Sequence, residues 1–216
     1  MIKSLDFEKQ KALARIHSHI CGDGCLYTFL QNRSPSSIRT SRSVKPFRNY
    51  VVEYDNNESG LLDEFERDIK SVFGREHYIY CGEKTRKIRN KRIYFLLKEM
   101  GCGKSREWKI PLVILNSLTL SKEWFRAFFD DEGTLDTSDR HKRARIKSVN
   151  LKGLKQASLL LKNLGIENSI TGPNKDNTWY LTTNDLLKFH KNFQLIHPKK
   201  SRLLKEIIMR QAGISG

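Results

Sequence analysis

The chain has 216 residues, which is enough for one large domain or two small ones with a hydrophobic core. Its 40 Lys and Arg residues against 24 acidic residues give a net charge of +16. A balance this basic points to a polyanionic partner, most often nucleic acid, although a ribosomal-type or membrane-surface protein would share it. No apolar run approaches a membrane span and the N-terminus lacks a signal-peptide core, so we expect a cytoplasmic protein with no membrane partner.

The first predicted element is a helix with Asp6 as its N-cap and Cys21 near its end. Its apolar and small residues recur at helical spacing: Leu13, Ile16, Ser18, Ile20 and Gly22. The segment closes with Asp23 and Gly24. An acid at this place is locally unfavourable unless a cation sits nearby, because the C-terminal end of a helix already carries partial negative charge.

Residues 25–30 and 49–54 are predicted to be the two strands of a hairpin. The connection over residues 31–48 is rich in Ser and Arg. The positive charge of this connection favours contact with phosphates. We equally expect it to be disordered in the free protein. A helix is predicted over residues 61–73.

Two more strands are expected at about residues 77–81 and 92–97. Between them, six of the nine residues from Lys84 to Arg92 are basic. We expect this segment to be a hairpin tip that runs along a nucleic-acid backbone, with a solvated tip as the alternative.

A second helix with an acidic end follows Ser121, its predicted N-cap. Ala127 is a small residue that would let another backbone approach. The helix ends in three carboxylates: Asp130, Asp131 and Glu132. Gly133 is predicted to stop it in the left-handed conformation.

The order of elements then repeats. Strands are predicted over 134–136, 143–148 and 178–182 and near Ser169, and helices over 154–164, over 184–193 and beyond 200–202. Corresponding positions are Gly60 and Gly153, Gly74 and Gly165, and 104–106 and 200–202. Each half therefore has the order αββαββα, and we expect an α+β fold with two pseudo-symmetric halves, residues 1–110 and 111–216.

Parallel packing of the two acid-terminated helices would bring Asp23 and Glu132 together. Converging carboxylates are costly without a metal, and oxygen ligands suit Mg²⁺, Mn²⁺ or Ca²⁺ better than Zn²⁺. The four cysteines and six histidines have no recurring metal-ligand spacing, so we expect small buried thiols and structural or surface histidines. A disulfide would require a hyperthermophilic host or an oxidising compartment.

Residues 16–24 and 125–133 resemble the two motifs of a single-chain LAGLIDADG homing endonuclease. The letters that agree are Ile20, Asp23 and Gly24 in the first copy and Asp130 and Gly133 in the second. His17 and His19 stand where the family has alanine and leucine, and Asp131 stands where it prefers a small residue. The order of elements matches the family over nearly the whole chain.

The resemblance implies antiparallel β-sheets that form a DNA-binding saddle, with the motif helices packed at its centre. It also implies an intron-encoded monomer that hydrolyses phosphodiesters on both strands of a long asymmetric DNA site. Mg²⁺ would be the cofactor, Mn²⁺ would substitute for it, and Ca²⁺ would support binding without cleavage. Asp23 and Glu132 would hold the metal, with the backbone carbonyls of Gly22 and Asp131 completing its coordination.

Further site residues also follow from the resemblance. Lys104 and Lys200 match each other in the repeat and correspond to basic residues that tune the attacking water near the scissile phosphates. Ordinary surface lysines are the alternative. Asp55 matches Ser148 at a strand end beside the solvent pocket, and the remaining candidates for that place are Lys147 and Asn150.

DNA contacts are expected from the strands, which would meet base edges in the major groove, and from the basic connections, which would meet phosphates. The candidates are Tyr27, Arg33, Arg39, Arg42, Arg48, Lys84, Arg86, Lys87, Arg89, Arg143, Arg145 and Lys147.

Three alternatives to a nuclease share the basic charge. An intron maturase would also bind intron RNA, and a DNA-binding regulator would keep the fold without cleavage. A ribosomal or structural protein would leave the two acid-glycine helix ends unexplained. The chain begins directly before the first motif helix, so we expect a free-standing protein rather than part of an intein, either nucleoid-associated in the cytoplasm or in an organellar host.

Overall fold

The computed structural model describes residues 5–31, 46–74, 79–138 and 141–211. The N-terminal half contains α1 (Phe7–Cys21), β1 (Gly24–Gln31), β2 (Phe47–Asp55), α2 (Ser59–Phe73), β3 (Ile79–Cys81), β4 (Thr85–Arg89) and α3 (Lys91–Glu99). The C-terminal half contains α4 (Leu112–Leu115), α5 (Leu118–Glu132), β5 (Gly133–Ser138), β6 (His141–Ser148), α6 (Leu151–Asn163), β7 (Ser169–Thr171), β8 (Trp179–Thr183), α7 (Leu186–Asn192) and α8 (Pro198–Gln211). The predicted α+β fold with two αββαββα repeats is therefore confirmed. Among the described residues, none of the helices combines the length and apolar composition needed to cross a membrane.

The first sheet is antiparallel throughout, with the strand order β1-β2-β4-β3. Val52 of β2 pairs with Leu26 of β1 and with Ile88 of β4. Val52 and Ile88 are buried, and Tyr54, two residues along β2, packs its ring on Phe65 of α2. These residues therefore define the helix-covered face. Side chains alternate along a strand, so the residues between them point to the opposite side, here called the open face.

The second sheet repeats this arrangement with the order β5-β6-β8-β7. Its buried residues Ala144, Ile146 and Leu181 are neighbours or diagonal neighbours across β6 and β8. Arg143, Arg145 and Lys147 of β6 alternate with these buried positions and point to the open face.

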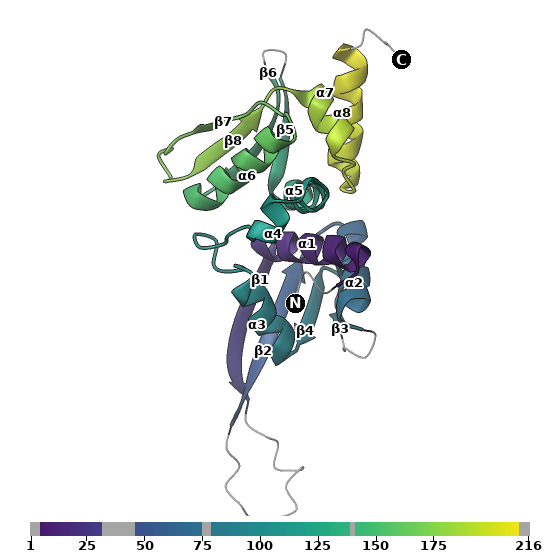
Figure 1. The fold of residues 1–216 in the computed structure, drawn as a ribbon, viewed down its shortest axis with the longest axis vertical. Coiled ribbons are helices and arrows are strands. Elements are labelled where there is room, and N and C mark those ends of the chain that lie inside the picture. The colour runs from purple at the N-terminus through teal and green to yellow at the C-terminus, as the bar shows by residue number, and fades with distance from the viewer. Residues whose placement is uncertain (1–4, 32–45, 75–78, 139–140, 212–216) are drawn as a thin grey trace, which may run out of the picture.

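The two motif helices lie between the two sheets, with one half of the molecule on each side (Figure 1). Trp124 and Phe128 of α5 stack at 4.8 Å between ring centres and are fully buried. Trp108, from the connection between the halves, packs on both rings at 6.0 Å and 5.0 Å. The core is therefore continuous from the connection into the C-terminal half, and the boundary between residues 110 and 111 stays a prediction.

The structure corrects the prediction for residues 84–97. The basic segment is not a hairpin tip but the strand β4, and the expected strand after it is the helix α3. Asn90 caps α3, because its side chain accepts a hydrogen bond from the backbone N–H of Ile93 at 3.0 Å. The buried residues of α3 follow helical spacing: Ile93, Tyr94 and Leu97. The same apolar residues are equally typical of a short strand, which explains the wrong assignment.

The start and end of α5 also differ from expectation. Ser117 caps the helix, whereas Ser121 lies inside it and donates its hydroxyl to the carbonyl of Ile114 at 2.9 Å. Gly133 has a φ of −76°, so it is extended rather than left-handed. Glycine is needed there for space, since an added Cβ would lie 2.4 Å from the carbonyl oxygen of Phe129.

Candidate active site at the paired helix ends

The C-terminal ends of α1 and α5 meet because the helices pack through small and polar side chains. Ser18 Oγ donates to the carbonyl of Trp124 at 2.7 Å, and Trp124 Nε1–H donates to His17 Nδ1 at 2.9 Å. Further along both helices, His19 Nδ1 lies 2.9 Å from Asp131 Oδ2. These contacts advance in the same direction along the two helices, so their acidic ends lie together.

Asp23 follows α1 and Glu132 ends α5. The Asp131 carboxylate at the end of α5 helps to raise the pKa of Asp23, and Asp23 in turn helps to raise the pKa of Glu132. Burial, followed by the charge of Asp131, raises the pKa of Asp23 from 3.8 to about 6. Burial, followed by the charges of Asp23 and Asp131, raises the pKa of Glu132 from 4.5 to about 7. Lys200 opposes both shifts without cancelling them. The negative charge is therefore only partly compensated by the protein, which fits a bound cation.

Asp23 lines a hollow of 590 Å³ whose walls come from both halves. The acidic residues around it are Asp23, Glu53, Asp55, Glu58, Asp130 and Asp131, and Lys84 also lines it. This concentration of carboxylates occurs on a chain with a net charge of +16. The carboxylate oxygens of these residues fit a hard divalent cation such as Mg²⁺, Mn²⁺ or Ca²⁺.

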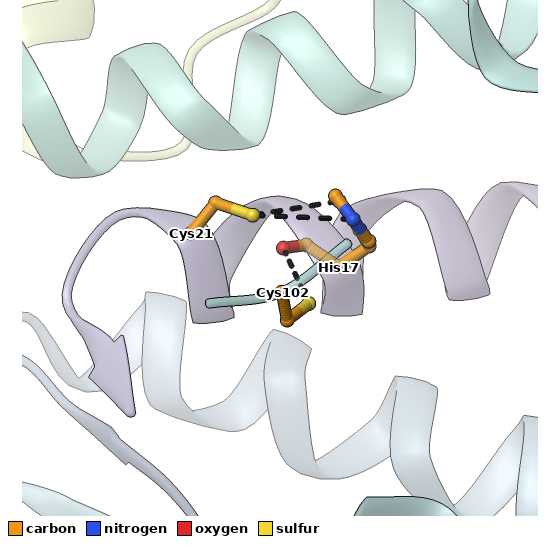
Figure 2. A group of neighbouring side chains, drawn as sticks. All are labelled: His17, Cys21 and Cys102. Carbon is orange, nitrogen blue, oxygen red and sulfur yellow. Dashed lines mark hydrogen bonds between the residues drawn. The ribbon is translucent and has the colours of Figure 1, made fainter. Parts of the chain in front are cut away.

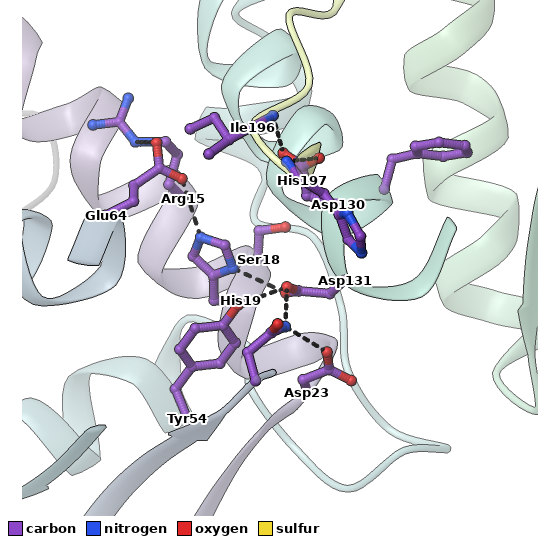
Figure 3. Close-up of polar contacts among 12 residues, drawn as sticks. Arg15, Ser18, His19, Asp23, Tyr54, Glu64, Asp130, Asp131, Ile196 and His197 are labelled. Carbon is purple, nitrogen blue, oxygen red and sulfur yellow. Dashed lines mark hydrogen bonds and ion pairs between the residues drawn. The ribbon is translucent and has the colours of Figure 1, made fainter. Parts of the chain in front are cut away.

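The side chain of Asp131 is enclosed by donors (Figure 3). The Tyr54 hydroxyl donates to Asp131 Oδ1 at 2.7 Å, while His19 contacts Oδ2. Asn56 Nδ2 contacts Asp131 Oδ1 at 3.4 Å and donates to Asp23 Oδ2 at 3.0 Å. Asp131 therefore supports the position of Asp23 through Asn56, and its own carboxylate is already engaged.

His19 is held between two carboxylates deep in the interface. Its Nε2 lies 3.3 Å from Glu64 Oε2, on the side opposite the Asp131 contact. Glu64 also accepts two hydrogen bonds from Arg126, at 2.7 Å and 2.8 Å, and Arg126 contacts Asp130 Oδ2 at 3.1 Å. Burial acts to lower the pKa of His19, but Asp131 and Glu64 outweigh it and raise that pKa to about 9. A chain of buried charges thus joins α2 to both motif helices.

Lys200 lies in the first turn of α8 and closes the end of α5. Its Nζ donates to the carbonyls of Phe129 at 3.1 Å, Asp130 at 2.6 Å and Asp131 at 3.0 Å. Carbonyls in the last turn of a helix carry partial negative charge, so a cation beside them is favourable. The Asp131 carbonyl, expected to bind metal, accordingly accepts a hydrogen bond from an ammonium group.

Of the other predicted catalytic residues, only some line the acidic hollow. Lys104 is exposed in the segment after α3, and neither Lys104 nor Lys200 lines the acidic hollow, so the catalytic role of Lys104 stays a prediction. Asp55 does line the hollow and accepts a hydrogen bond from a threonine hydroxyl of β4. Ser148 and Asn150 contact each other at the start of α6, where Ser148 Oγ accepts the backbone N–H of Asn150 at 3.1 Å.

Three of the predicted DNA contacts lie on the open face of the first sheet. Tyr27 donates its hydroxyl to Glu53 Oε2 at 2.5 Å, and Lys87 Nζ lies 3.1 Å from the same oxygen. The Arg89 guanidinium lies over the ring of Phe29, 5.4 Å from its centre. Basic, acidic and aromatic groups are therefore arranged side by side on one surface.

Arg86 lies instead on the helix-covered face. It binds Glu66 Oε2 at 3.0 Å and Asp63 Oδ1 at 3.2 Å, both on α2. Adjacent residues of a strand point to opposite faces of the sheet, so Arg86 faces α2 while the neighbouring Lys87 lies on the open face.

Arg48 is exposed near the start of β2, and Lys84 lines the acidic hollow. The remaining candidates lie outside the described residues: Arg33, Arg39 and Arg42.

The open face of the second sheet carries the three basic residues expected from β6. Arg143 and Arg145 approach the same oxygen of Asp136, at 3.1 Å and 3.6 Å. Arg145 lies over the ring of Tyr180 at 5.0 Å, and Lys147 lies over the same ring at 5.9 Å. Both halves thus present cations next to aromatic rings on their open faces.

The sequence did not predict a role in the site for several residues that form its buried hydrogen bonds: His19, Tyr54, Asn56, Glu64 and Arg126. The available signal was a charged or polar residue on the apolar side of a helix. His19 stands between two buried isoleucines of α1, and Glu64 stands beside Phe65 in the buried part of α2. Such residues need buried partners, although their identity depends on the fold.

Residues 119–195 match the family model described as a LAGLIDADG-like domain. Over 179 residues the chain is 24% identical to an uncharacterized protein of Methanocaldococcus jannaschii. This match covers 78% of the chain and 60% of that relative, so the chain spans less than two thirds of the relative's length.

Solved structures share the fold. The homing endonuclease I-DmoI, in complex with DNA and Mn, matches with a TM-score of 0.59 at 19% identity, covering 85% of this chain and 96% of that one. I-DmoI has also been solved in complex with DNA and Ca. Full-length DUF199/WhiA of Thermotoga maritima matches with a TM-score of 0.57 at 11% identity, covering 97% of this chain and 63% of that one.

The two antiparallel sheets and the paired acid-terminated helices together have the fold of LAGLIDADG proteins. More specifically, residues 119–195 match a LAGLIDADG-like domain, and 91% of the chain matches the fold of the homing endonuclease I-DmoI. The resemblance predicted from two short motifs is therefore confirmed.

Proposed function

We propose that the protein is a metal-dependent DNA endonuclease of the homing type, which cuts both strands of a long asymmetric site. The observation that carries this proposal is the convergence of Asp23 and Glu132, whose pKa values are raised to about 6 and about 7. Paired carboxylates with unbalanced charge suit a cation at the reacting phosphates. A protein that only binds DNA gains nothing from such an arrangement at two helix ends.

Asp23 and Glu132 would hold the divalent cation, with Mg²⁺ as the physiological ion, Mn²⁺ as a substitute and Ca²⁺ as an ion that supports binding alone. Such an ion lowers the pKa of a water and neutralises the leaving oxygen in phosphodiester hydrolysis. The I-DmoI complexes with DNA and Mn or Ca support this choice of ions.

The protein's own residues have separate tasks around the reacting groups. Asn56 donates to Asp23 and fixes the orientation of its carboxylate. Lys200 holds the end of α5 through three carbonyls, which sets the position of Glu132 at that end. Asp55, on the wall of the hollow, would hold a water there.

Double-stranded DNA would lie across the open faces of the two sheets, with the acidic hollow beneath its cleavage site. Lys87 and Arg89 in the first sheet and Arg143 and Arg145 in the second would contact one half-site each. The halves, residues 1–110 and 111–216, differ in these side chains, so they would read unlike half-sites as a monomer. Intron encoding and a nucleoid location accord with this activity.

A DNA-binding regulator without cleavage is the second candidate, with an intron maturase as a further form of it. One observation favours it: Lys200 donates to the Asp131 carbonyl that a metal would otherwise use. Retention of both terminal acids, Asp23 and Glu132, favours the nuclease.

The deciding experiment starts from a pool of randomised double-stranded DNA. Sequences bound in Ca²⁺ are selected and then incubated with Mg²⁺ and the intact protein, with Asp23→Asn, with Glu132→Gln or with the exposed control Glu8→Gln. We expect defined double-strand cuts from the intact protein and Glu8→Gln only. DNA affinity of the two site variants should stay within roughly tenfold, or about 1.4 kcal/mol.

Binding without cuts by the intact protein, in Mg²⁺ and in Mn²⁺, would favour the regulator. Cuts that persist in both Asp23→Asn and Glu132→Gln would place the reaction elsewhere on the molecule.

A further inference from the structure

Two of the cysteines meet at the last turn of α1 (Figure 2). Cys21 ends α1 and Cys102 follows α3, and the two residues are only 7% and 3% exposed. Both sulfur atoms and a ring nitrogen of His17 lie within 4.8 Å of one another. Cys102 Sγ donates to the carbonyl of His17 at 3.7 Å, which holds it against α1.

One histidine and two cysteines are residue types that bind metal ions, but both ring nitrogens of His17 already have hydrogen-bond partners. Nδ1 accepts the indole N–H of Trp124 at 2.9 Å, so Nε2 carries the ring proton and donates to the carbonyl of Met100 at 3.2 Å. A metal on Nδ1 would leave a buried indole donor without an acceptor, and a metal on Nε2 would displace that proton. The geometry therefore favours chemistry between the two thiols over metal ligation.

Cys102, although only 3% exposed, lines a hollow of 570 Å³ that is open to solvent. The charged residues around the hollow are Lys98, Arg106, Lys109 and Lys152, with Glu99 and Glu107. Their net positive charge attracts a small anionic reagent.

We propose that Cys21 and Cys102 are a redox modification site that forms a disulfide with a small anionic disulfide, such as oxidised glutathione, as the oxidant. The Cys102 thiolate attacks one sulfur of the reagent, and the other half leaves as a thiolate. Cys21 then attacks the Cys102 sulfur and releases the second half, which departs with the Cys21 proton. Two protein thiols are oxidised while one small disulfide is reduced to two small thiols. Since the two sulfur atoms lie within 4.8 Å of each other, each has to move by at most roughly 1.4 Å to reach bonding distance.

The bond ties the end of α1 to the connection between the two halves. It closes a loop of about 80 residues that contains the whole first sheet, and long loops lose most entropy in the unfolded chain when they are closed. Because Cys21 directly precedes Gly22 and Asp23, oxidation also restrains the helix end that carries the acidic site. This inference does not depend on whether the protein cleaves DNA.

The test equilibrates the whole reduced chain with mixtures of reduced and oxidised glutathione and maps disulfides by mass spectrometry of non-reduced peptides. We expect one linked peptide pair, joining Cys21 to Cys102, and a rise in Tm on the order of 10 °C on oxidation. Cys21→Ser and Cys102→Ser should lose that rise. The matched controls Cys25→Ser and Cys81→Ser, which remove exposed thiols, should keep it.

Peptide mapping of the unaltered chain decides the result even if a variant folds poorly. Cys21 and Cys102 thiols that stay reduced at every glutathione ratio, with adducts only at Cys25 and Cys81, would overturn the proposal. Stoichiometric Zn²⁺ retained by the reduced chain, with a cobalt-thiolate absorption lost in Cys102→Ser, would overturn it as well, because the thiols would then be metal ligands.

Discussion

Replacing Glu132 with Gln should stabilise the metal-free protein at pH 8, although it removes a residue proposed to be essential for cleavage. Burial and the charges of Asp23 and Asp131 raise the pKa of Glu132 from 4.5 to about 7. Between these two pH values the folded state binds more protons than the unfolded state. The free energy of unfolding therefore falls as the pH rises through this window, and glutamine, which does not ionise, removes the loss.

The size of the effect follows from the pKa of Glu132. One pKa unit corresponds to about 1.4 kcal/mol, so the shift from 4.5 to about 7 sets an upper limit of about 3 kcal/mol. The side chain is partly exposed and Lys200 lies nearby, so solvent screening reduces the expected gain to about 1.5 kcal/mol. For a chain of this size, the corresponding rise in Tm is roughly 3–6 °C.

The assay is thermal unfolding in EDTA at pH 4.5 and pH 8 for the unaltered protein, Glu132→Gln and the exposed control Glu8→Gln. Only Glu132→Gln should gain stability, and only at pH 8. Adding Mg²⁺ at 100 times its Kd should stabilise the unaltered protein by about 2.7 kcal/mol but not the variant. An equal gain at both pH values, or a loss at pH 8, would refute the repulsion between the two helix ends.

His19→Gln should remove a loss of stability at alkaline pH. Burial acts to lower the pKa of His19, but Asp131 and Glu64 outweigh it and raise that pKa from 6.5 to about 9. The stability that protonated His19 contributes is therefore complete below pH 6.5 and is lost as the pH rises through about 9. The Tm of the unaltered protein should therefore fall more steeply from pH 7 to pH 10 than that of the variant, and equal slopes would contradict the buried ion pair. Replacing Lys87 and Arg89 with Gln should flatten the salt dependence of DNA binding, measured by fluorescence anisotropy, by roughly 0.9 per lost phosphate contact. Arg86→Gln should lower the Tm and leave that slope unchanged, since Arg86 binds α2; a flattened slope in this variant would place the DNA on the other face.

Local signals in the sequence determined the duplicated order of elements and the position of the acids. Asp6 caps α1 as predicted, because its side chain accepts the backbone N–H of a residue three positions along. Gly74 and Gly165 end their helices with positive φ, the conformation that favours glycine. Asp23 and Glu132 lie at helix ends as predicted, since caps and hydrophobic periodicity depend only on near neighbours.

Only the tertiary structure decided which residues share a surface or a partner. Arg86 and Lys87 are adjacent basic residues, yet β4 pairs so that one binds α2 and the other faces outward. His19 becomes a buried cation because Glu64 and Asp131, far away in the sequence, pack on either side of it. Long-range packing sets the register of a strand, the partners of a buried charge and its pKa. None of these is a property of a short segment.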